Sequence, residues 1–282
     1  MLLSWLRNRR RRRLLAGPFP GAWEAHLARH FAQDAWLDEA ERRRLRELVR
    51  IFVAEKRWEG CGGLALTDEI RVAIAAHACL LILGLPGEPY RHVHSILVYP
   101  STVVPPPRRL RTLEIATRPI DAPQPILGQA QLRGPVILVW DAVERTGRHL
   151  EEGHDVVLHE FAHALDMLDG VGDGTPPIRG RTELRRWVEV FSREYRALLE
   201  QTRQGRPGLI DAYGATNEAE FFAVVTEKFF GQPIELRHRH ADLYAVMRDF
   251  YRQDPAARLE RLASSPGRPA DQAPFTATTS QT

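Results

Sequence analysis

Two histidines and a glutamate, His159, Glu160 and His163 in the run HEFAHALD, have a spacing that suits metal chemistry. On an α-helix, residues four apart lie one turn along and about 40° round, so both imidazoles can reach one ion. Glu160 can then point at a water on that ion, whose pKa zinc lowers towards ~7. The pattern therefore indicates one zinc ion (Zn²⁺) with Glu160 as general base. A solvated helix with incidental histidines is the alternative.

A third protein ligand is needed, because a catalytic zinc site usually combines three ligands with an open position. No third histidine follows at short spacing, and His154 is expected to face away from the pair. Asp166 shares a helix face with both histidines, where it could orient an imidazole or be a plain surface residue. The candidate ligands are the downstream carboxylates Asp166, Asp169, Asp173, Asp211, Glu218, Glu220 and Glu227.

The run YGATNEAEFF at 213–222 places two of these carboxylates at the start of an expected helix. If Asn217 caps that helix, Glu220 at the third helical position could complete a capping box instead of binding metal. A carboxylate in a first turn also suits the helix dipole. Spacing alone therefore leaves the choice open between Glu218 and Glu220. Tyr213, on the same grounds, is most simply a packed aromatic residue at a loop.

The elements that must position these residues follow from the periodicity of apolar side chains. Helical spacing predicts helices over 22–57, 67–83, 155–168, 182–201, 216–230 and 239–251. Runs of β-branched residues predict strands over 94–104 and 136–139, with a weaker one over 126–132. Helices, then strands, then helices again indicate an α+β domain with a small mixed sheet and mostly helical surroundings.

The chain of 282 residues divides into one domain and two tails. The turn-forming run GPFPG at 17–21 separates a basic N-terminal tail, 1–17, from a domain over 18–262. Small polar residues over 263–282 predict a disordered C-terminal tail.

The formal charge of +3 is unevenly placed, because Arg7 and the run 9–13 supply six arginines. Outside them, acidic residues outnumber basic ones, so nucleic-acid binding is not inferred. The tail is either a solvated charge run or a contact for an anionic membrane or nucleic-acid surface. No apolar run is long enough to predict a membrane span. Cys61 and Cys79 fit no disulfide framework, and two reduced thiols favour a cytoplasmic protein.

HEFAHALD and YGATNEAEFF together resemble the Mlc titration factor A family of bacterial zinc peptidases, and are similar to motifs in the catalytic domain of anthrax lethal factor. The resemblance extends over roughly 20–262, without the arginine run or the last twenty residues. It implies a zincin-like metallopeptidase domain of gluzincin type, with Glu220 rather than Glu218 as the third ligand beside His159 and His163. It also implies that Tyr213 stabilises the oxyanion, and that 136–139 is an edge strand pairing with an extended peptide.

Two functions follow from these expectations. The first is a zinc metallopeptidase that hydrolyses peptide or protein substrates with Glu160 as general base, for which an aminopeptidase and an endopeptidase both remain open. The second is a regulator that sequesters a transcriptional repressor resembling Mlc, and thereby affects sugar-uptake genes, with catalysis secondary. A regulator would not need Glu160, so Glu160→Gln separates the two.

Overall fold

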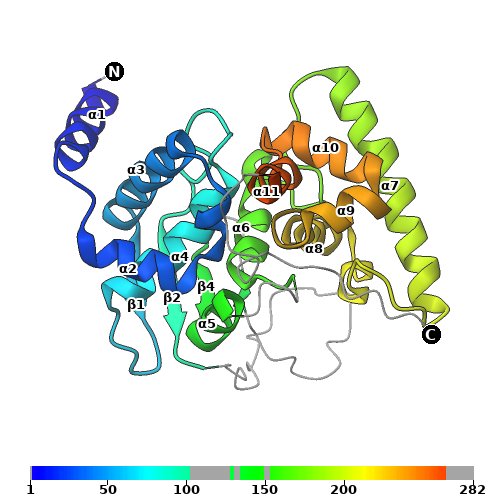
Figure 1. The fold of residues 1–282 in the computed structure, drawn as a ribbon, viewed down its shortest axis with the longest axis horizontal. Coiled ribbons are helices and arrows are strands. Elements are labelled where there is room, and N and C mark those ends of the chain that lie inside the picture. Colours follow the sequence, from blue (N-terminus) through cyan, green and yellow to red (C-terminus); the bar gives the residue numbers. More distant parts are fainter. Residues whose placement is uncertain (1, 102–127, 130–133, 149–152, 265–282) are drawn as a thin grey trace, which may run out of the picture.

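The computed structural model describes residues 2–101, 128–129, 134–148 and 153–264, which form helices around a small sheet. The elements before the sheet's centre are α1 (Leu2–Leu15), α2 (Gly21–His30), η1 (Ala32–Trp36), α3 (Glu39–Glu55), β1 (Arg57–Gly60), α4 (Asp68–Leu81) and β2 (Ser95–Tyr99). Those that follow are β3 (Gly128–Gln129), β4 (Val136–Val139), α5 (Trp140–Arg148), α6 (Val156–Asp166), η3 (Met167–Asp169), α7 (Arg181–Arg203), η4 (Ala212–Ala215), α8 (Glu218–Gly231), α9 (Pro233–Arg239), α10 (Ala241–Tyr251) and α11 (Pro255–Ser264). In Figure 1, α6 lies between α1–α4 on one side and α7–α10 on the other. The predicted α+β class is confirmed.

The sheet has the strand order β1-β2-β4-β3, with the first three strands parallel and β3 antiparallel to β4. One face of its centre is apolar and buried, because Ile96 and Val98 on β2 lie beside Val136 and Leu138 on β4 and all four are buried. The prediction that 136–139 is an edge strand is wrong, because β4 is paired on both sides. The edge beside it is β3, whose two residues fall inside the weakly predicted strand 126–132.

Side-chain caps explain where several helices begin. The predicted helical stretch 22–57 is divided into α2, η1 and α3, and Asp38 starts α3 with a complete capping box. Its carboxylate accepts the Glu41 N–H at 2.9 Å, while the Glu41 carboxylate accepts the Asp38 N–H at 3.0 Å. Thr67 caps α4 by accepting the Ile70 N–H, without a return bond from the Ile70 side chain. These bonds satisfy donors that the first turn of a helix leaves without partners.

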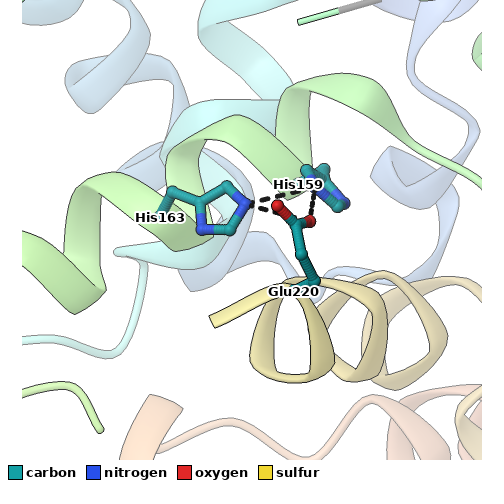
Figure 2. A group of neighbouring side chains, drawn as sticks. All are labelled: His159, His163 and Glu220. Atoms are coloured by element: carbon teal, nitrogen blue, oxygen red, sulfur yellow. Dashed lines mark hydrogen bonds and ion pairs between the residues drawn. The ribbon is translucent and has the colours of Figure 1, made fainter. Parts of the chain in front are cut away.

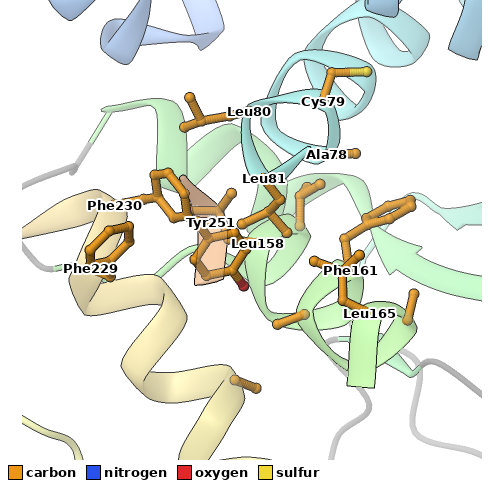
Figure 3. Packing of buried hydrophobic residues seen from close by; sticks show 14 of the residues in the cluster. Ala78, Cys79, Leu80, Leu81, Leu158, Phe161, Leu165, Phe229, Phe230 and Tyr251 are labelled. Atoms are coloured by element: carbon orange, nitrogen blue, oxygen red, sulfur yellow. The ribbon is translucent and has the colours of Figure 1, made fainter. Parts of the chain in front are cut away.

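The hydrophobic core is centred on α6 (Figure 3). Leu158, Phe161 and Leu165 on this helix are fully buried, and they face α4 on one side and α8 on the other. The Phe161 ring makes an edge contact with the Tyr90 ring at 4.9 Å between centroids. Burying each side chain of this size stabilises the fold by roughly 1.5–3 kcal/mol. Packing of its apolar side thus holds α6 in place, and the same helix carries His159 and His163.

Besides α1, three helices were not predicted, and two of them begin at a proline. α9 begins at Pro233 and α11 at Pro255, positions where proline fits a first helical turn because it needs no N–H there. α5 directly follows β4 without a turn residue between them. Residues 2–15, expected as a tail, form α1. The part of the predicted C-terminal tail beyond residue 264 lies outside the described residues.

Candidate metal centre

The N-terminus of α6 is held in place by Asp155, and this fixes where the two histidines point. The Asp155 carboxylate accepts the N–H groups of Val157 and Leu158 at 2.9 and 3.0 Å. Its other oxygen lies 2.5 Å from Nδ1 of the buried His77 on α4. α6 is therefore tied both to its own first turn and to a neighbouring helix before the histidines are reached.

His159, His163 and Glu220 come together at one point, as the ligand atoms in Figure 2 show. Oε2 of Glu220 lies 3.0 Å from Nε2 of His159 and 3.4 Å from Nε2 of His163. The two Nε2 atoms are 3.2 Å apart. A tetrahedral zinc ion with bonds of about 2.1 Å would hold its ligand atoms about 3.4 Å from one another. The donor types and their separations both fit zinc.

This cluster is distinctive within the part of the chain that the structure describes. There, it is the one group of three or more His, Cys, Asp or Glu side chains whose ligand atoms all lie within 4.8 Å. The structure brings Glu220 and not Glu218 to the histidines. Asn217 does cap α8 by accepting the Glu220 N–H at 2.9 Å, but the Glu220 carboxylate is directed to the imidazoles. The capping and ligand interpretations are thus compatible for this residue.

Glu227 orients His159, a role that sequence reasoning missed. It is one of the buried charged residues, seven positions after Glu220 on α8 and therefore on nearly the same helix face. Oε1 lies 2.7 Å from Nδ1 of His159, and Oε2 accepts the Asp155 N–H at 2.7 Å. A proton on Nδ1 that is donated to Glu227 leaves the Nε2 lone pair for a metal. The spacing of seven residues between Glu220 and Glu227 could have indicated this role, but the sequence analysis considered Glu227 only as a metal ligand.

The remaining carboxylate candidates serve the backbone near them. Asp166 is fully buried, and its Oδ2 accepts the Gly174 N–H at 2.8 Å instead of contacting an imidazole. Asp169 and Asp173 each accept an N–H two residues further on. Asp211 caps η4 and accepts the Tyr213 N–H at 2.7 Å. His154 reaches Glu227, not the ligand cluster, with 3.7 Å between Nδ1 and Oε2.

The electrostatics of the cluster favour a positive charge between its members. Burial raises the pKa of Glu220, but hydrogen bonds with His159 and His163 outweigh it and bring the value to about 2. Burial lowers the pKa of His159, whereas bonds to Glu220 and Glu227 raise it to about 10. A proton on His159 and a metal cation bound to it would both be stabilised by the negative charges of Glu220 and Glu227. The two therefore compete for the site.

Glu160 and Tyr213 both lie near this cluster. Glu160 is buried, and its charge is among those that raise the pKa values of His159 and Tyr213. The Tyr213 ring centroid is 6.0 Å from that of His159. Burial, followed by the charges of Glu220, Glu160 and Glu227, raises the pKa of Tyr213, so its phenol keeps its proton at neutral pH. A protonated phenol beside the cluster can donate a hydrogen bond to developing negative charge.

The arrangement can be set beside known proteins. A family described as glucose-regulated metallo-peptidase M90 matches residues 5–252. The chain belongs to this family. The M90 match begins at residue 5 and includes the arginine run, which corrects the expectation that the resemblance starts near residue 20. It stops short of the last twenty residues, as expected.

Several M90 relatives cover most of this chain. An uncharacterized protein of Synechocystis, slr2042, is 38% identical over 263 residues and covers 90% of both chains. Mlc titration factor A of Serratia proteamaculans is 32% identical over 233 residues, which are 80% of this chain and 85% of that one. The protein of the same name in Yersinia pestis is 31% identical over 248 residues, 85% of this chain and 88% of its own. The resemblance to the Mlc titration factor A family is confirmed.

Among residues 2–101, 128–129, 134–148 and 153–264, no helix combines the length and apolarity that crossing a bilayer requires.

Proposed function

We propose that this protein is a zinc-dependent peptidase of gluzincin type, with a zincin-like domain. The observation that carries the proposal is the convergence of His159, His163 and Glu220 at separations suited to one zinc ion. Membership of a metallopeptidase family supports the same assignment. Bound zinc would supply a Lewis acid that polarises a peptide carbonyl and lowers the pKa of water.

The remaining steps belong to side chains of this chain. Glu160 takes a proton from the attacking water as the new C–O bond forms, and then passes this proton to the amine nitrogen as the C–N bond breaks. Tyr213 donates its phenolic proton in a hydrogen bond to the oxygen of the attacked carbonyl. Glu227 keeps His159 in the tautomer that presents Nε2. These roles are supported by the nearness of Tyr213 and Glu227 to His159, and by the charge of Glu160 acting on His159.

Glu160→Gln tests this mechanism directly. Glutamine keeps the size of the side chain but cannot accept the water's proton, so we expect peptide hydrolysis to fall about 10²–10⁴-fold while zinc stays bound. Zinc content by atomic spectroscopy and turnover of a peptide library are measured on the same samples. Hydrolysis that survives in a zinc-loaded Glu160→Gln protein would show that Glu160 is not the base.

The position of the cleaved bond can be tested with the same library. We propose aminopeptidase activity, which requires a free amino terminus on the substrate. Peptides with acetylated amino termini should then resist cleavage, whereas an endopeptidase would cleave the free and acetylated forms equally. Comparing the cleavage products by mass spectrometry decides between the two.

A regulatory function is the second candidate, and the names of two relatives favour it. Proteins called Mlc titration factor A are 31–32% identical to this chain over most of its length. We propose that this protein binds a transcriptional repressor resembling Mlc. Repressor capture measured with the wild-type and Glu160→Gln proteins separates binding from catalysis, because sequestration alone would be equal in both.

A further inference from the structure

The N-terminal helix α1 has one face tied to the rest of the protein. Arg7 lies 3.0 Å from Glu88, and Arg11, one turn later, pairs with Glu55 at 2.6 Å and with Glu88 at 2.5 Å. Arg50 of α3 secures the end of the helix by donating to the Leu14 carbonyl oxygen. These contacts fix the orientation of α1 about its own axis, so its opposite face is defined as well.

That opposite face carries apolar and cationic side chains together. Positions two residues apart on a helix differ by about 200°, so Arg9 and Arg13 point away from the tied Arg7 and Arg11. Both are exposed, as is Arg12. Trp5 and Leu6 are exposed by 52% and 48%, and the Arg9 guanidinium lies over the Trp5 ring at 5.4 Å. We call Trp5, Leu6, Arg9, Arg12 and Arg13 the outer face of α1.

The position and charge of α1 determine which partners its outer face can meet. Figure 1 shows α1 at one extremity of the molecule, beyond α3 and far from α7–α10. The rest of the chain has more acidic than basic residues, so a broad anionic surface would repel it and attract α1. The protein would therefore approach such a surface with α1 directed towards it.

We propose that the outer face of α1 docks the protein on an anionic lipid bilayer. Arginines attract anionic headgroups, while an exposed Trp–Leu pair gains by entering the interfacial region, where tryptophan is favoured. Nucleic acid would also attract the arginines of this face, but it would not bury Trp5 and Leu6 to a comparable extent. The inference is independent of the peptidase proposal, since none of these five residues contributes to the metal centre.

Vesicle co-sedimentation of the full chain tests the inference. Vesicles of equal parts phosphatidylcholine and phosphatidylglycerol should bind the protein, and vesicles of phosphatidylcholine alone should not. Each arginine near an anionic surface contributes about a fivefold gain in affinity, so R9Q/R12Q/R13Q should lower it on the order of a hundredfold. W5A/L6A should lower it as well, without changing the charge.

A matched control removes the same charge elsewhere. Arg181, Arg185 and Arg196 are exposed on α7, and R181Q/R185Q/R196Q should bind vesicles as the wild type does. Equal losses in the two triple variants, or an unchanged affinity in W5A/L6A, would overturn the proposal in favour of unspecific charge attraction. Tighter binding to duplex DNA or RNA than to the anionic vesicles at the same ionic strength would also overturn it. Circular dichroism confirms that each variant is folded.

Discussion

The Glu227 carboxylate serves two parts of the site at once, since it accepts the Asp155 N–H and contacts Nδ1 of His159. A carboxylate has two acceptor oxygens, and both are used here. An amide in its place keeps only one, so either the helix backbone or the histidine must lose its partner. The position of a ligand nitrogen therefore depends on a residue that binds no metal itself.

Glu227→Gln should consequently weaken zinc binding without abolishing it. Loss of a carboxylate partner on a ligand histidine typically lowers metal affinity about 10–100-fold. Competition with a chromophoric chelator measures the change. Glu260→Gln, at an exposed carboxylate paired with Arg237, is the control and should bind zinc normally. Equal affinities in both variants would remove Glu227 from the metal centre.

The raised pKa of Asp166 predicts how the stability of the protein changes with pH. Burial raises its pKa from 3.8 to about 6 in the folded chain, so the folded state holds this proton more tightly than the unfolded state. The resulting stabilisation is present below about pH 4 and is lost as the pH rises through 6. The asparagine of Asp166→Asn does not titrate, so this variant does not lose stability in this way as the pH rises. Between pH 4 and 7, its free energy of unfolding should therefore rise by up to about 3 kcal/mol relative to that of the wild type.

Urea unfolding at the two pH values, with a chelator present, measures this difference between the proteins. The chelator matters because a cation on the nearby His163 would itself favour the ionised carboxylate. A difference that does not change with pH would mean that Asp166 titrates normally.

At the scale of elements, we expect α6 to depend on its N-terminal cap more than α3 does. Asp155 caps α6 and also contacts the buried His77, whereas Asp38 caps α3 at an exposed position. Removing a cap costs about 0.5–2 kcal/mol, and leaving a buried polar group without its partner costs about 1–3 kcal/mol more. The two caps therefore form a natural pair for comparison.

Asp155→Ala should lower the free energy of unfolding by about 2–4 kcal/mol, and Asp38→Ala by about 1 kcal/mol. Chemical denaturation of the two variants beside the wild type measures both values. Similar losses would mean that the contact with His77 contributes nothing to the stability of α6.

How far sequence predicts these elements depends on how local their causes are. The helix carrying His159 and His163 was predicted because its apolar period and ligand spacing lie in one short run. The choice of Glu220 over Glu218 could not be made from spacing, since it depends on how α8 packs against α6. β3 is only two residues long, so its pairing with β4 leaves almost no pattern. Glu227 required knowledge of which helix faces His159.

For the whole molecule, the candidate ligands matter because they come from two helices. His159 and His163 lie on α6 and Glu220 on α8, so one ion would link these helices across the core (Figure 2). A ligand that binds only the folded state at a thousandfold excess over its dissociation constant stabilises that state by about 4 kcal/mol. Metal binding and stability should therefore change together.

Removing zinc with a chelator should lower the melting temperature, and adding zinc back should restore it. Glu160→Gln should respond as the wild type does, because Glu160 is not among the ligands. His163→Ala should show no response to zinc at all. A melting temperature that zinc leaves unchanged in the wild type would contradict the proposed ligand set.

The link between α6 and α8 also bears on how long each copy of the protein survives in a cell. Proteolytic degradation samples the transiently opened chain, and a drop of a few kcal/mol in stability enlarges that population many times. When zinc is scarce, copies without the ion would be degraded first. The amount of this protein would then follow the supply of zinc, with no change in its synthesis.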